Sequence, residues 1–231
     1  MNLNRTFPLL FIISVLMSFS VRAELSIQIT QGIDNPIPIA VVPFSWEGSG
    51  VLDEDIGEIV TADLQQVGEF RALSPSNMLA LPREEREVYY RDWSVLAQDY
   101  LLVGKVQRSP GSELIQVQYE FFDINREIKL AGEVLTGTTS QLRDIGHEIS
   151  NVVFELVTGT RGAFTTQILY IVSEFVSPEV SYFRLEKADY DGRRAQVLLE
   201  SREPIMSPSW SPNGQDIAYV SFETDLPRIY T

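Results

Sequence analysis

Two short segments repeat one another, and this repeat restricts the possible folds of the chain more than any other feature. Ile168–Ile171 and Ile217–Val220 match in residue type and begin about 49 residues apart. Internal periods of about 40–50 residues that contain short strands are typical of propeller blades, because each small sheet buries its apolar face against the next. We therefore predict that residues 163–231 form an incomplete β-propeller of about one and a half blades. In this prediction the two copies are equivalent innermost strands of successive sheets.

A proline-rich string stands just before the second copy. Ser207–Gly214 reads SPSWSPNG, and its prolines favour a stiff segment that links two blades. Trp210 is large enough to fill the space between blades. Asn213 and Gly214 form a typical turn pair, since glycine adopts positive φ at low cost.

Residues 24–162 follow a different pattern, in which strand and helix periods are mixed. Helices are predicted over Asp53–Val67 and Ser140–Thr158, where apolar residues recur every three or four positions. Acidic residues crowd the start of the first helix, and Gly68 and Gly159 stand where C-terminal caps are expected. Together, the predicted strands and helices indicate an α+β amino-terminal domain, a mixed sheet with helices packed on it. The other predicted elements are strands at Leu25–Ile29, Ile37–Val42, Tyr100–Val106, Glu113–Asp123 and Glu127–Thr136 and a short helix at Glu84–Tyr90.

Residues 1–23 have the three parts of a secretory signal peptide. A positive charge at Arg5 precedes the apolar stretch Phe7–Val21, and a small residue, Ala23, ends the segment. We predict cleavage between Ala23 and Glu24 and export to the periplasm. The alternative is an uncleaved membrane anchor, but the apolar stretch is shorter than the about 20 residues that a spanning helix needs.

The charge balance restricts the partners. The chain carries a formal net charge of −14 and contains no cysteine. An acidic protein repels phosphate backbones and anionic lipid surfaces, so nucleic acid is not an expected partner. No disulfide can form without cysteine, and no lipid can be attached to a terminal thiol. We expect a soluble protein without direct membrane insertion.

The sequence leads us to expect a protein that is not an enzyme. It contains no Gly-x-Ser-x-Gly elbow, dinucleotide-binding glycine pattern or phosphate loop. His147 is the only histidine, and a helical projection places it opposite the apolar stripe of its helix, so we predict a solvent-facing side chain. No catalytic residue, cofactor or metal ligand is expected. The other candidates receive structural roles: Asp53–Asp55 at a helix start, Asp189 and Asp191 in a blade turn, and Trp46 and Trp93 in the core.

Several stretches resemble the TolB family of periplasmic propeller proteins. Ser207–Gly214 followed by Ile217–Val220 resembles the propeller repeat that this family shares with prolyl-oligopeptidase-type enzymes. The resemblance extends from the signal peptide to Thr231 and is weakest over Ser74–Trp93. Three stretches are similar to TolB in particular: Pro38–Phe44, Glu54–Leu64 and Leu156–Phe164.

This resemblance implies a small α/β domain followed by a propeller that has six blades when complete. It implies a protein-binding scaffold that links TolA, in the inner membrane, to the lipoprotein Pal, in the outer membrane. Such a scaffold supports outer-membrane integrity and constriction at cell division. Colicins, phages and other outer-membrane proteins are further implied partners.

The implied Pal site lies largely on later blades, so we expect the chain to be the amino-terminal part of a longer protein. The alternative is the amino-terminal part of a propeller-bearing serine peptidase, whose catalytic domain would follow. An α/β domain placed before the propeller favours the scaffold.

The resemblance assigns TolA binding to the start of the mature protein. Leu25, Ile27 and Ile29 alternate with polar residues, which would let this segment add a strand to a sheet of the partner. The pattern alone leaves open an ordinary edge strand in the protein's own sheet. The predicted TolA-binding residues are Glu24, Leu25, Ser26, Ile27, Gln28, Ile29, Thr30, Gln31, Gly32 and Ile33.

Overall fold

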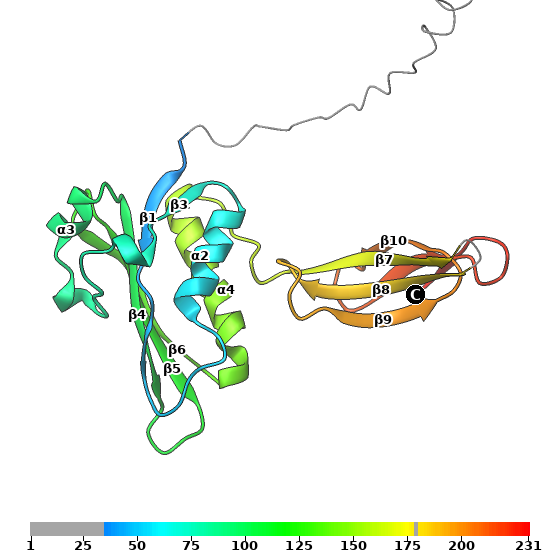
Figure 1. Cartoon of the computed structure of the whole chain (residues 1–231), viewed down its shortest axis with the longest axis horizontal. Coiled ribbons are helices and arrows are strands. Elements are labelled where there is room, and N and C mark those ends of the chain that lie inside the picture. Colours follow the sequence, from blue (N-terminus) through cyan, green and yellow to red (C-terminus); the bar gives the residue numbers. More distant parts are fainter. Residues whose placement is uncertain (1–34, 178–179) are drawn as a thin grey trace, which may run out of the picture. The chain divides into compact units, whose positions relative to one another are not determined.

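The computed structural model describes residues 35–177 and 180–231. The predicted signal peptide, its cleavage site and the predicted strand Leu25–Ile29 lie outside these ranges. The described residues form an α/β domain followed by two small antiparallel sheets (Figure 1). This arrangement confirms the predicted fold class, a mixed sheet with helices followed by strands of propeller type.

The α/β domain is built on one six-stranded mixed sheet. The strand order is β3-β1-β4-β5-β6, and β2 pairs with β4 off this path. β1 runs parallel to both β3 and β4, whereas β4, β5 and β6 follow one another as antiparallel hairpins. The strands are β1 (Ile37–Val41), β2 (Ser45–Glu47), β3 (Phe70–Ala72), β4 (Tyr100–Arg108), β5 (Ile115–Asp123) and β6 (Ile128–Gly137).

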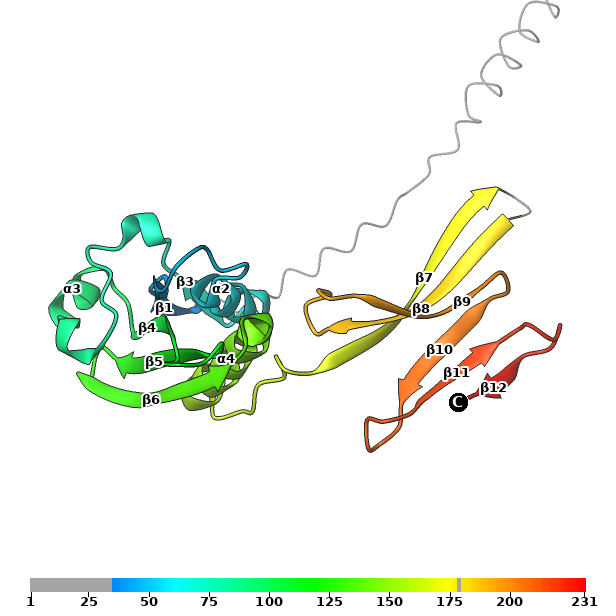
Figure 2. The same cartoon turned by 90° about the horizontal axis from the view of Figure 1, so that it is seen from below.

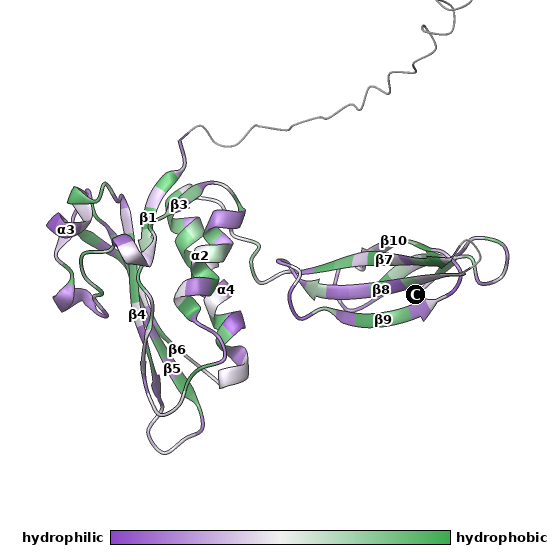
Figure 3. Ribbon diagram, viewed as in Figure 1, coloured by the Kyte–Doolittle hydropathy of each residue, from purple (hydrophilic) through white to green (hydrophobic). Residues whose placement is uncertain are grey.

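The first strand lies between two apolar cores, which explains its continuous apolar run. Ile39 and Val41 pack into the core under the helices, whereas Ala40 and Val42 pack into the core on the opposite face. Figure 1 shows α2 (Ile56–Gln66) and α4 (Leu142–Thr158) on one face of the sheet and α3 (Tyr90–Val95) on the other. Hydrophobic residues colour much of α2 and β4 in Figure 3, where the helices meet the sheet.

Both predicted long helices are confirmed, with ends set by local capping. α2 begins later than predicted because Asp55 is its N-cap and accepts a hydrogen bond from the Glu58 backbone N–H at 3.1 Å. α4 ends at Thr158 and is capped by Gly159, whose φ of +73° is the left-handed conformation that glycine adopts without strain.

The predicted helix Glu84–Tyr90 is wrong. Only Glu85–Glu87 forms a single 3-10 turn, and the α-helix starts at Tyr90. The acidic side chains of this segment bind the sheet instead: Lys105 Nζ donates to Glu84 Oε2 at 3.0 Å. The helix that does form carries Trp93 into the second core, where 1 % of its surface is exposed, as expected for a core residue.

The second half forms two three-stranded antiparallel sheets, which Figure 2 shows separately. The repeat prediction holds only in part. Ile168–Ile171 and Ile217–Val220 lie in strands that each pair antiparallel with the next strand. However, β11 is the central strand of its sheet, whereas β7 is an edge strand among the described residues. The strands are β7 (Gln167–Ser177), β8 (Val180–Asp189), β9 (Gln196–Ser201), β10 (Ile205–Trp210), β11 (Ile217–Ser221) and β12 (Arg228–Tyr230).

The string Ser207–Gly214 is not a linker between sheets, contrary to the prediction. Its first half belongs to β10, which pairs with β11, and its second half forms the hairpin turn. Pro208 fits within the strand because the ladder is irregular between Met206 and Ser209. Trp210 lines a small cavity together with Gln167 of β7 and Gly214.

Gly104 allows a close contact in the centre of the sheet. A Cβ at this position would lie 2.3 Å from Phe44 Cε2 and 2.7 Å from the Gln118 carbonyl oxygen. We expect Gly104→Ala to lower the free energy of unfolding by about 1–3 kcal/mol, measured by urea denaturation, because the backbone contact cannot relax. Gly132→Ala is the matched control: its closest neighbour is the flexible Glu120 side chain at 3.3 Å. A change within about 0.5 kcal/mol is expected there, and equal losses in both variants would contradict the packing argument.

Candidate functional site

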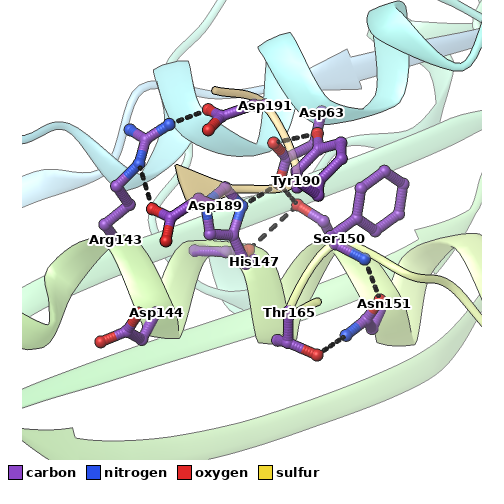
Figure 4. Close-up of polar contacts among 12 residues, drawn as sticks. Asp63, Arg143, Asp144, His147, Ser150, Asn151, Thr165, Asp189, Tyr190 and Asp191 are labelled. Atoms are coloured by element: carbon purple, nitrogen blue, oxygen red, sulfur yellow. Dashed lines mark hydrogen bonds and ion pairs between the residues drawn. The ribbon is translucent and has the colours of Figure 1, made fainter. Parts of the chain in front are cut away.

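A buried polar cluster forms where α2 packs on α4. Asp63 comes from α2, and His147 and Ser150 come from α4; each is at most 2 % exposed. The Asp63 carboxylate accepts from Ser150 Oγ at 2.6 Å and faces His147 Nδ1 at 2.8 Å (Figure 4). The helices approach closely because a Cβ on Gly146 would lie 2.8 Å from an Ile59 methyl. The neighbouring carboxylate favours the tautomer with the proton on Nδ1.

The third donor to Asp63 comes from the second half of the chain. Tyr190, in the turn after β8, donates its hydroxyl hydrogen to Asp63 Oδ1 at 2.6 Å. Its ring packs edge-on against the rings of His147 and Phe164, with centroids 5.4 and 5.3 Å apart. The Tyr190 backbone N–H also donates to the Thr166 carbonyl at 3.0 Å. The turn therefore inserts one side chain between the two helices.

Charged residues surround this insertion. Arg143 of α4, whose side chain is 8 % exposed, forms ion pairs with Asp189, Asp191 and Glu54. Arg194 bridges Asp189 and Asp144, and so joins the same turn to α4 a second time. A buried carboxylate is stable only when it is paired, and Asp189, 7% exposed, pairs with both arginines.

Asn151 holds the connection between α4 and β7. Its Oδ1 accepts from the Phe164 backbone N–H at 3.0 Å, and its Nδ2 donates to Thr165 Oγ1 at 3.1 Å. The tyrosine, the two arginines and this amide together fix the start of the first propeller-type sheet on the α/β domain. We call the set of Asp63, Arg143, His147, Ser150, Asn151, Asp189, Tyr190, Asp191 and Arg194 the junction.

The junction does not have the geometry of a nucleophilic triad. Ser150 Oγ lies 2.6 Å from Asp63 Oδ2 and 3.0 Å from the Gly146 carbonyl, and both of these neighbours are acceptors. A serine nucleophile needs its hydroxyl on the imidazole, which here faces the same carboxylate instead. The residues present are arranged to hold two segments together.

Three ligand-type atoms of Asp63, His147 and Asp191 lie within 4.8 Å of one another. A metal ion among them would have to displace the hydroxyl hydrogens of Ser150 and Tyr190 from Asp63, and Arg143 from Asp191. Each displaced donor would be left without its bond in a buried site, which costs about 1–3 kcal/mol. This part of the junction is therefore a hydrogen-bonded cluster.

The predicted exposure of His147 is wrong. It lies opposite the apolar stripe of α4, but α2 and the Tyr190 turn cover that side, and 2 % of its surface remains exposed. Asp189 and Asp191 do shape a turn, since the Gly192 N–H donates to the Asp189 carbonyl at 2.9 Å. They also hold Arg143, which the sequence interpretation missed.

Asp63 could have been found from the sequence. It stands four residues after Ile59 and so falls within the apolar stripe of α2, where an unpaired acid is costly. Its partners are 84 to 127 residues away, and no local pattern indicates them. The predicted TolA-binding residues, Glu24 to Ile33, and the cleavage site at Ala23 and Glu24 lie outside the described residues.

Buried Tyr119 and half-buried Tyr190 predict a loss of stability in alkali. Burial, then the nearby Glu133 and Glu148, raises the pKa of Tyr119 to about 12. Burial, then the hydrogen bond to Asp63, raises the pKa of Tyr190 further above its ordinary value. The pKa of a tyrosine in the unfolded chain is about 10. Because the pKa is higher in the folded state, this contribution to stability is constant below pH about 10 and falls as the pH rises above it.

The measurement is the urea midpoint between pH 8 and 12. The slope should approach about 1.4 kcal/mol per pH unit for each proton retained by the folded state. Tyr119→Phe and Tyr190→Phe should each flatten the decline. Variant profiles parallel to that of the unchanged protein would contradict this assignment.

Comparison with known proteins finds the same family in both halves. A family model described as the TolB amino-terminal domain matches residues 25–130, and one described as the TolB beta propeller domain matches residues 154–231. Within the described ranges, none of the helices combines the length and apolar character needed to cross a membrane.

Relatives and a solved structure agree with these matches. "Tol-Pal system protein TolB" of Hahella chejuensis is 44% identical over 220 residues, which cover 95% of this chain and 51% of that protein. The protein of the same name from Pseudomonas aeruginosa is 43% identical over 215 residues, covering 93% and 49%. The crystal structure of TolB from Acinetobacter baumannii matches with a TM-score of 0.74 and 31% identity, over 85% of this chain and 46% of that one. The chain thus spans about half the length of these relatives.

Proposed function

Because the chain belongs to the TolB family, we propose that it is a non-catalytic, protein-binding scaffold of the Tol-Pal system in the periplasm. It links TolA of the inner membrane to Pal of the outer membrane and supports envelope integrity and constriction at division. The observation that carries this proposal is the order of the two matched domains, with the TolB amino-terminal domain before the TolB propeller domain.

The geometry of the junction supports a scaffold. Its ion pairs and hydrogen bonds join helices of the α/β domain to the first propeller-type sheet at several points. A scaffold that binds one partner at each end needs such a fixed connection. The one group of Asp, His and Ser residues in the junction lacks a base for its serine, which agrees with a role without catalysis.

The proposed TolA site is the amino-terminal segment, residues 24–33, which begins the chain after removal of the proposed signal peptide. Its alternate apolar residues would enter pockets of TolA while its backbone extends a sheet of the partner. Pal binds the propeller, largely through blades that follow residue 231 in a protein of the relatives' length.

The test measures binding of purified TolA periplasmic domain to two triple variants by titration calorimetry. Leu25→Ser, Ile27→Ser and Ile29→Ser together should abolish TolA binding, because the inserted side chains are lost. The matched control, Ser26→Ala, Gln28→Ala and Thr30→Ala, should bind within a few-fold of the unchanged protein. Deletion of residues 24–35 should also abolish TolA binding but leave Pal binding to the full-length protein. Unchanged TolA affinity in the variant that lacks residues 24–35 would contradict the proposal.

A further inference from the structure

A pocket of about 290 Å³ lies along one flank of α2, and we call it the α2 pocket. Ile59 and Asp63, the α2 residues that meet α4, project from the opposite flank. The α2 pocket therefore lies outside the junction. The helix lines it with residues that recur every three or four positions and so share one flank: Gly57, Glu58, Thr61, Ala62 and Gln65.

Apolar residues at the carboxyl ends of two parallel strands form the rest of the wall. Val41 ends β1, Pro43 follows it, and Pro75 follows β3. Crevices outside the carboxyl ends of parallel strands are common ligand sites in α/β folds. The wall is firm, because a Cβ on Gly57 would lie 3.2 Å from both Pro43 Cα and the Val42 carbonyl oxygen. Pockets for whole small molecules range upward from about 300 Å³, so this volume suits one side chain of a peptide.

The neighbouring edge of the sheet can hold an extended chain. β3 is an edge strand, and α2 packs against it (Figure 1). The Glu69 carbonyl and the Leu73 N–H both bond to β1, each at 2.8 Å. Since backbone groups alternate in direction along a strand, those of Phe70 and Ala72 point to the outer edge, where no strand pairs among the described residues. An extended peptide can bond to these groups by strand addition.

The charge beside the α2 pocket favours a cation. Four acids stand at the start of α2, at positions 53, 54, 55 and 58, and only Glu54 forms an ion pair within the described part of the chain. Asp55 and Glu58 line the pocket itself. The helix start contributes a partial charge of about +0.5, which offsets only part of one carboxylate. A basic group is therefore the complementary partner.

Two occupants that this chain could supply do not match that charge. Residues 24–33, which lie outside the described ranges, contain Glu24 and no lysine or arginine. A second copy of the chain would bring its own formal net charge of −14 against the same acids. The complementary occupant is a basic segment of another protein.

We propose that the α2 pocket and the outer edge of β3 together bind an extended, basic peptide segment of a partner protein. The segment adds a strand to β3 and inserts one apolar side chain between α2 and Pro75. Its lysine or arginine side chains lie beside Asp55 and Glu58. This surface is separate from residues 24–33 and from the propeller-type sheets, so the proposal does not rest on the proposed function.

A labelled peptide of alternating lysine and leucine, KLKLKLK, tests the chemistry of the occupant by fluorescence anisotropy. Serine in place of leucine should weaken binding at least about tenfold, because the buried apolar side chain is lost. Glutamate in place of lysine should weaken it at least about tenfold, because like charges then meet. Equal affinity of all three peptides would contradict the proposal.

Substitutions on exposed positions of the helices test the place of binding. Ala62→Trp fills the α2 pocket and should weaken binding of KLKLKLK at least about tenfold. Gln66→Trp puts the same side chain on α2 away from the pocket lining and should leave the affinity unchanged. Glu58→Gln should weaken binding about threefold, as expected for an exposed ion pair. Glu155→Gln, the matched change on α4, should have no effect.

Amide chemical shifts of the unchanged protein locate the peptide without any variant. KLKLKLK should shift the amides of Phe70, Ala72 and the α2 flank. Shifts spread over the acidic surface without these amides, or equal affinity in Ala62→Trp, would overturn the proposal and assign the binding to net charge. Dimerisation of the free protein in sedimentation, if Ala62→Trp removed it, would overturn the proposal in favour of a second copy.

Discussion

Replacing Asp63 by alanine is expected to lower the free energy of unfolding by about 3–5 kcal/mol, since each buried donor left without an acceptor costs about 1–3 kcal/mol. The loss follows because three donors, from His147, Ser150 and Tyr190, would remain buried without their common acceptor. Asp63→Asn should cost less, since its carbonyl oxygen still accepts from part of the set. Urea denaturation followed by circular dichroism measures the difference.

Asp144→Ala is the control for this prediction. Asp144 also crosses the junction, through Arg194, but its side chain is 52% exposed. Exposed ion pairs contribute at most about 1 kcal/mol, so the Asp144 variant should remain close to the unchanged protein. If the two variants lost equal stability, the junction would not depend on the buried acceptor.

A second large effect is expected on the other face of the sheet. Trp93→Ala should cost about 3–5 kcal/mol, because it empties the centre of the core that Ala40, Val42 and Phe122 share. Hydrogen exchange should show that amides of the segment around α3 lose protection first, since this helix is six residues long and is held by the one buried side chain.

Trp46→Ala is the matched substitution. Trp46 is only partly buried, and its indole N–H donates to the carbonyl of Gly50, in the segment just after β2, at 3.1 Å. We expect a loss below about half of that for Trp93, in proportion to the smaller area withdrawn from water. A larger effect at Trp46 than at Trp93 would contradict this account of the second core.

The strands and long helices of the α/β domain could be predicted because burial there follows a local period. Ile115, Val117, Tyr119 and Phe121 alternate in sequence, and all four are buried beneath the helices. Periodicity failed in the acidic stretch that begins at Glu84, because side-chain bonds to the sheet determine the backbone conformation there. Periodicity also failed to predict the order of strands in a sheet. The sequences of β7 and β11 have the same pattern, but of the two only β11 has a neighbouring strand on both sides among the described residues.

The junction could not be predicted because its partners are distant in sequence and meet only in the folded chain. A helical projection of α4 treats the side away from the sheet as solvent, and so placed His147 in water. The side is covered by a turn 43 or more residues later in the chain, whose tyrosine has no distinguishing local pattern. The prediction for the proline-rich string Ser207–Gly214 was wrong for a related reason. Its prolines favoured a linker, but the irregular pairing of β10 with β11 leaves room for Pro208 within a strand.

The insertion of Tyr190 restricts how such proteins can recombine. A hybrid that joined residues 1–162 to the propeller of a distant relative would keep Asp63 and Arg143 but exchange the turn that pairs with them. Unless the incoming turn supplied an equivalent hydroxyl and carboxylates, two buried charges would lose partners. A crossover placed after Arg194 would preserve every one of these pairs. The position at which two such proteins can be joined without loss of these contacts therefore lies inside the first propeller-type sheet, and not at the link between the domains.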